Sequence, residues 1–450
     1  MSEQEQRGVS AGTILMLLLT VVVTVCCIII LPRLMGPVNI RMDDNAMLSS
    51  TNLNDSLPEL AQNDIPLTFT TPEPEATSVP AATETPVPMI TAAAEPTAVP
   101  VTASLSLTFG GSINVDDLIR KSGFYSDTDK YDFSENLSLI SQELDSDYTL
   151  VTLECITDAD GNVRQIPNGP PEVMGMLTSA NVDMVALGYN RAFERGIEGV
   201  SATIREAEGS GMQTLGLYDS PEDAANMRIV DVNGVQIAYL HYATSITNTA
   251  KRKMNTDDAS YAMPITNINS GGEQIAADIA GAREAGAHVV VVVINWSGTD
   301  SVNTTTTKMK NFMQTLADAG ADVIIGTGTK TVKEVSWFVG KREDGSTHQT
   351  LCAWSLGSLL NGERNNGNVA GMLLHVQLNV GPGGVNFERV SYTPTYIWRF
   401  KQDDYYRYRV VASDQPAPAG MDDSQASNAA RALETLRKAL GNSPITMRIK

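Results

Sequence analysis

Residues 273–296 read EQIAADIAGAREAGAHVVVVVINW, and this stretch decides the fold class of the chain. Apolar residues at helical spacing predict a helix over 273–285. The uninterrupted β-branched run from His288 to Ile294 predicts a buried strand. Short strands that alternate with helices are typical of α/β domains.

The same alternation extends over residues 104–411. Further helices are predicted at 199–208 and 306–319. Asn233-Gly234, between two apolar runs, predicts a two-residue hairpin turn. After Val411 a linker leads to an amphipathic helix at 424–440, which we expect to dock weakly or not at all. The other predicted strands lie at 106–109, 148–153, 183–187, 235–242, 322–325, 332–339, 351–354 and 372–378.

The N-terminal quarter has a different composition. Residues 14–31 read ILMLLLTVVVTVCCIIIL, and no charged residue occurs between Gly8 and Pro32. This length suits a bilayer span, so we predict a cytoplasmic tail over 1–11 and a transmembrane helix over 12–34. Residues 35–102 are rich in Pro, Thr, Ala and Glu, which predicts a disordered extracytoplasmic linker. Although basic residues flank both ends of the span, long domains translocate largely regardless of flanking charge, and a single-pass cell-membrane protein follows.

Charge and cysteine content restrict the remaining domain, residues 103–411, and its C-terminal extension, 412–450. The net charge of −20 argues against nucleic acid as a partner, because phosphate binding requires a basic surface. Cys155 and Cys352 are the only cysteines outside the apolar span, and we interpret them as buried thiols rather than a disulfide. None of the four histidines forms a metal-binding pair by spacing.

Six blocks of the domain each contain a predicted strand: LSLTFGGSIN (105–114), YTLVTLE (148–154), VDMVALGYNRAFERG (182–196), HVVVVVINWSGTD (288–300), AGADVIIGTGTKTV (319–332) and LCAWSLGSLL (351–360). In this order they resemble the CapA family, bacterial surface proteins tied to poly-γ-glutamate capsule synthesis. The resemblance implies an α/β fold in which a metallophosphoesterase-like β-sandwich is flanked by helices, here preceded by a transmembrane helix and a disordered stalk.

The chain departs from the family at the metal-binding positions. Glu154 and Asn190 are retained, but Ser112 and Glu194 stand where the family has aspartates. The family's histidines are replaced by Arg191, Asn295, Gly328 and Lys330. We therefore expect no metal and no cofactor. The candidate binding cleft consists of Ser112, Glu154, Asn190, Arg191, Glu194, Asn295 and Lys330.

Three functions are compatible with this pattern. The favoured one is a non-catalytic binding or assembly domain of the cell envelope, linked to capsule or surface-polymer (poly-γ-glutamate) biosynthesis, whose partners are the membrane and an envelope polymer or protein. The alternative is a metal-dependent hydrolase of phosphoesters or poly-γ-glutamate, with a site rebuilt from Glu154, Asn190, Glu194 and Asp300 as oxygen ligands. The third is a structural spacer. In the favoured reading, Arg191 and Lys330 replace the metal charge beside Glu154 and Glu194.

Overall fold

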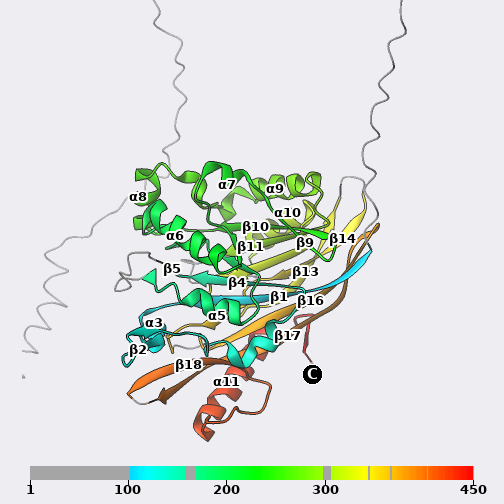
Figure 1. Cartoon of the computed structure of the whole chain (residues 1–450). Helices are drawn as coiled ribbons and strands as arrows, with labels where there is room; N and C mark the ends of the chain where they lie inside the picture. Colours follow the sequence, from blue (N-terminus) through cyan, green and yellow to red (C-terminus); the bar gives the residue numbers. More distant parts are fainter. Residues whose placement is uncertain are drawn as a thin grey trace, which may run out of the picture. The chain divides into compact units, whose positions relative to one another are not determined.

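The computed structural model describes residues 102–157, 168–296, 306–342, 345–364, 367–402 and 404–448 (Figure 1). These residues all belong to one compact unit, 92–450. The predicted cytoplasmic tail, transmembrane helix and linker lie outside the described residues, apart from the linker's last residue. None of the helices that the structure describes is long and apolar enough to cross a bilayer.

Two sheets form the centre of the unit. The larger, nine-stranded sheet has the order β18-β17-β16-β1-β4-β7-β8, and β15 and β19 pair with β1 and β17. Its strands are β1 (Ala103–Asn114), β4 (Tyr148–Glu154), β7 (Met184–Ala186), β8 (Gln213–Leu215), β15 (Ser358–Leu360), β16 (Ala370–Gly381), β17 (Gly384–Gln402), β18 (Tyr405–Ala412) and β19 (Thr446–Met447).

The second sheet has six strands in the order β13-β14-β12-β11-β10-β9. They are β9 (Arg228–Val232), β10 (Val235–Ala243), β11 (Val289–Asn295), β12 (Val323–Thr327), β13 (Val335–Lys341) and β14 (Thr347–Ala353). Two short ribbons complete the strands: β2 (Phe124–Tyr125) with β3 (Lys130–Tyr131), and β5 (Ile156–Thr157) with β6 (Asn168–Gly169).

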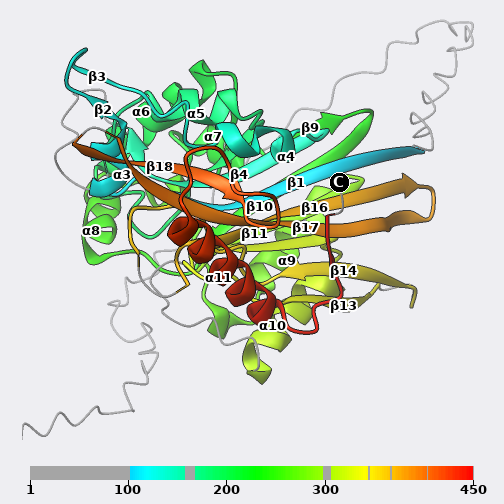
Figure 2. The same ribbon diagram turned by 90° about the horizontal axis from the view of Figure 1, so that it is seen from below.

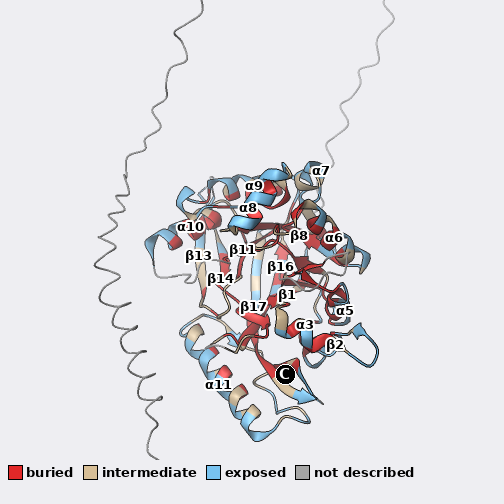
Figure 3. Ribbon diagram, turned by 90° about the vertical axis from the view of Figure 1, so that its left-hand side faces the viewer, coloured by how far each residue is buried: buried red, intermediate tan, exposed pale blue. Residues whose placement is uncertain are grey.

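The two sheets pack face to face. Successive side chains of a strand point to opposite faces, so Leu107 and Phe109 of β1 enter the same buried cluster as Tyr239, Val291 and Ile325 of the second sheet. Helices cover the outer faces, as Figure 3 shows by their buried inner sides. They are α3 (Asp117–Gly123), α4 (Ser141–Leu144), α5 (Val173–Ser179), α6 (Gly196–Gly209), α8 (Asn248–Thr256), α9 (Glu273–Glu284) and α10 (Thr307–Asp318). The short helix α7 (Pro221–Ala225) has no buried residue.

Most local predictions are confirmed within a few residues, and the mixed α/β class with its sandwich and flanking helices is as expected. Asn233 and Gly234 both have positive φ, at 55° and 84°, as the hairpin turn requires. Cys155 and Cys352 are buried free thiols. Asp116 caps α3 by accepting hydrogen bonds from the backbone N–H groups of Leu118 and Ile119.

The C-terminal helix α11 (Asp423–Leu440) docks firmly, so the expectation of weak or no docking is wrong. Figure 2 shows the helix beside β17. Ala429 and Ala432 pack against the β17 and β18 side of the large sheet, and Leu436 enters the core between the sheets. The side chain of Gln425 accepts a 3.0 Å hydrogen bond from Trp398. The helix therefore belongs to the fold rather than being appended to it.

Candidate functional site

The carboxyl ends of the parallel strands of both sheets meet at one edge of the sandwich. In the large sheet Asn114 lies opposite Glu154, and in the small sheet Asn295 lies opposite Thr327. The sheets are joined here by a 3.0 Å hydrogen bond from the backbone N–H of Gly328 to the hydroxyl of Ser112. Residues that are far apart in the sequence are thus brought to one edge.

Close backbone approach fixes the position of Ser112. Its N–H donates to the carbonyl of Gly357 at 3.0 Å, beside the pairing of β1 with β15. The preceding residue, Gly111, permits this approach, since a Cβ there would lie 2.2 Å from that carbonyl oxygen. The Ser112 side chain is buried and already accepts the Gly328 hydrogen bond.

The turn after β7 carries an internal ion pair. Arg191 donates to one carboxylate oxygen of Glu194 from Nη2 at 2.8 Å and from Nε at 3.1 Å. The other oxygen of Glu194 accepts a 2.8 Å hydrogen bond from the hydroxyl of Thr247, whose backbone N–H donates to the carbonyl of Asn190. Hydrogen bonding to Glu194 raises the pKa of Arg191. The loop after β7 is thereby tied to the loop after β10.

Lys330 has a different partner from the expected one. Its Nζ lies 2.5 Å from a carboxylate oxygen of Glu363, and both side chains are about two-fifths exposed (41% and 42%). The hypothesis that Lys330 neutralises Glu154 or Glu194 is therefore wrong, because the ion-pair partner of Lys330 is Glu363, in the loop after β15. Arg191 pairs with Glu194, as the hypothesis expected.

Glu154 and Asn295 make longer polar contacts at the same edge. A carboxylate oxygen of Glu154 accepts from the side-chain amide of Asn114 at 3.5 Å. The side-chain amide of Asn295 donates to the hydroxyl of Thr327 at 3.4 Å. The backbone carbonyl of Asn295 accepts a 3.0 Å hydrogen bond from the backbone N–H of Thr244. Asp300 lies outside the described residues.

Sequence reasoning missed two members of this site. Thr247 holds Glu194 and Asn190, but no local pattern marks it. Tyr189 is buried immediately before Asn190, burial raises the pKa of its hydroxyl, and that hydroxyl has no hydrogen-bond partner among the described residues. The position of Tyr189 inside the 182–196 block was the one sequence signal that could have marked it as a member of the site.

The donor set does not fit a two-metal centre. Such a centre needs carboxylate, imidazole and amide ligands that hold two ions about 3.5–4 Å apart. At the corresponding positions Glu154 and Asn190 are retained, but the other positions include a hydrogen-bonded serine, a glycine and two cations, and each cation is in an ion pair. In the described parts of the chain, no three His, Cys, Asp or Glu side chains gather closely enough to bind an ion.

Comparisons with known proteins find a matching family and similar solved structures. The family model for the bacterial capsule synthesis protein PGA_cap matches residues 106–363. Similar solved structures include the calcineurin-like phosphoesterase YfkN from Bacillus subtilis, with 12% identity over 75% of this chain and 99% of that chain and a TM-score of 0.37. Another is GAP50, the anchor in the inner membrane complex of Plasmodium, with 10% identity, 77% and 98% coverage and a TM-score of 0.27. No curated protein sequence matched. The family match includes every strand end described above.

Proposed function

Since the chain belongs to the family of bacterial capsule synthesis proteins, we propose that its strand-end site binds an envelope component without catalysing a reaction. The component is a capsule or surface polymer, such as poly-γ-glutamate, or an envelope protein. One observation carries the proposal: both carboxylate oxygens of Glu194 already accept hydrogen bonds, one from Arg191 and the other from Thr247. A carboxylate held in this way by the chain itself is poorly prepared to ligate a cation.

The exposed cations give the site its binding chemistry. Arg191 and Lys330 are 36% and 41% exposed although each is in an ion pair. A guanidinium has five N–H donors in a planar fork and an ammonium has three, so both can donate to a ligand while keeping their carboxylate partners. Carboxylate or phosphate groups along an envelope polymer are suitable acceptors.

Turnover and metal content test this function on the purified full-length chain. We expect hydrolysis of bis-p-nitrophenyl phosphate at background rate with added Mn²⁺, and the same rate for Glu154→Gln. We also expect no stoichiometric Mn, Fe or Zn in elemental analysis, because imidazole ligands are absent from the family positions. Metal-dependent turnover that Glu154→Gln abolishes would instead establish the hydrolase with a rebuilt oxygen-ligand site.

We further propose that residues 12–34 hold the chain in the bacterial cell membrane, with the domain outside. The support is the uncharged, apolar stretch from Gly8 to Pro32. Protease added to intact cells is expected to release a fragment that contains residues 103–448. Protection of the domain until the cells are lysed would contradict this orientation.

A further inference from the structure

A cavity of about 350 Å³ lies between β17 and α11, and all its charged lining residues are arginines. They are Arg364, Arg399 and Arg431, and we call this site the arginine pocket. No aspartate or glutamate lines it, although the chain carries a net charge of −20. Every lining residue follows residue 363, so the pocket lies beyond the part of the chain that the family model matches.

Uncharged partners hold the three guanidinium groups. Arg364 donates to the carbonyl of Ile397 at 2.6 Å and to the hydroxyl of Tyr396 at 3.0 Å. The guanidinium of Arg399 stacks 4.5 Å from the ring centroid of Tyr406. Arg431 donates to the side-chain oxygen of Asn428, one turn before it on α11. Such partners orient a guanidinium but leave its charge uncompensated.

The neighbouring carboxylates are engaged elsewhere. Glu363, next to Arg364, binds Lys330 at 2.5 Å and also accepts from Asn368. Glu434, three residues after Arg431, lies 4.0 Å from Lys438. Within the described ranges, none of the three arginines takes part in an ion pair. Three like charges around one cavity repel one another, and a bound anion relieves this repulsion.

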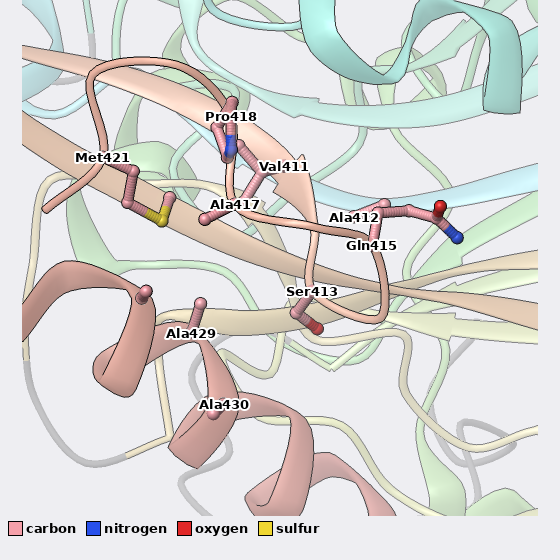
Figure 4. A pocket seen from close by; sticks show the side chains of 10 residues that line it. Val411, Ala412, Ser413, Gln415, Ala417, Pro418, Met421, Ala429 and Ala430 are labelled. Atoms are coloured by element: carbon pink, nitrogen blue, oxygen red, sulfur yellow. The ribbon is translucent and has the colours of Figure 1, made fainter. Parts of the chain in front are cut away.

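A second cavity against the same helix has no charged lining residue. It has a volume of about 210 Å³ and lies between α11 and the turn that follows β18 (Figure 4). Its lining is uncharged and mostly apolar, and includes Ala417, Pro418, Met421, Ala429 and Ala430. The concentration of charge in the arginine pocket is therefore not a general property of the surface around α11.

We propose that the arginine pocket binds an oxyanion that carries two or more negative charges, either a phosphate or a polycarboxylate. Guanidinium forks match the paired oxygens of both groups, and three of them favour a multiply charged ligand over a single carboxylate. The volume lies at the lower end of the range for small-molecule sites and suits one small anion. The proposal does not depend on whether the strand-end site is catalytic.

Calorimetric titration of the full-length chain at low ionic strength tests the proposal, with inorganic phosphate in one arm and citrate in the other. We expect saturable one-site binding in at least one arm, and the tighter arm identifies the anion class. Arg431→Gln is expected to weaken that binding at least about tenfold, because it removes charge-assisted hydrogen bonds. Raising the salt concentration should weaken binding as well.

Arg437→Gln is the matched control, since Arg437 is exposed on the same helix but does not line the pocket. It makes the same change in net charge and is expected to alter the affinity less than about twofold. Equal melting temperatures of the two variants would exclude loss of the fold as the cause. Absence of saturable binding in both arms, or equal weakening by both substitutions, would overturn the proposal.

Discussion

His241 occupies a narrow slot between the two sheets. Its ring lies against the backbone of Gly188 and Gly216, where an added Cβ would come within 2.5 Å of ring atoms. The side chain is 1% exposed, and neither ring nitrogen has a hydrogen-bond partner in the described structure. Burial lowers the pKa of His241 to about 3, so the imidazole is neutral at pH 7. This histidine is therefore a buried residue of the core.

The free energy of unfolding should fall as the pH falls below about 6.5. The unfolded chain binds a proton at His241 near pH 6.5, whereas the folded chain does so only near pH 3, so protonation favours unfolding between these values. From pH 6.5 to 4.5 this residue alone contributes a loss of about 2–3 kcal/mol. Denaturant titrations of the wild type and His241→Leu across this range would measure it. An equally steep decline in the variant would refute the assignment to His241.

The site residues show which contacts a sequence can predict. Arg191 and Glu194 are three residues apart, and their pairing could be expected from the block that contains both. Lys330 and Glu363 are 33 residues apart and meet only because the loops after β12 and β15 converge. Opposite charges were available at several distances from Lys330, and only the tertiary structure decides between them. Thr247 was missed for the same reason.

At the level of elements, strands with continuous apolar runs were predictable, whereas β17 and β18, which have exposed polar ends, were not. β11 is buried along its whole length. The end of β17 and the start of β18 read RFKQDDYYRYR over 399–409, a polar stretch that has no strand-like alternation. The docking of α11 was missed because its buried residues include Ala429 and Ala432, which add little to an apolar pattern.

Leu436 links α11 to the main core and is 1% exposed. Leu436→Ala should lower the free energy of unfolding by about 2–5 kcal/mol, through lost burial and the cavity that remains. Glu434→Ala, at an exposed position of the same helix, should change it by less than about 0.5 kcal/mol. Chemical denaturation of both variants provides the measurement. Equal stability of the two variants would mean that the helix docks as weakly as its sequence suggests.

Across the whole molecule, the part that the family model matches is not a complete folding unit. The match ends at residue 363, before β16, β17 and β18. β16 lies between β1 and β17 in the large sheet and supplies Leu374, Val376 and Leu378 to the core between the sheets. Without it, β1 loses all of its antiparallel pairing, and only the short parallel pairing with β15 remains along that edge.

A fragment that spans 102–363 should therefore fail to fold, whereas 102–448 should unfold in one cooperative transition. The short fragment keeps the strand-end residues but exposes the apolar face that β16 covers. Calorimetry and amide hydrogen exchange on the two fragments distinguish these states. A cooperative transition in 102–363 would show that β16 and the strands after it are dispensable.

The pairing of β1 with β16 also has a consequence for biosynthesis. Ala103 pairs with Val380, which is 380 − 103 = 277 positions later. At a translation speed of roughly 5–20 residues per second, the nascent β1 waits on the order of 15–55 s for this neighbour. During that interval β4 can join one edge of β1 and the second sheet can cover its apolar face, but most of the other edge remains unpaired. The emerging chain thus offers a binding segment to holdase chaperones until nearly all of it has been made.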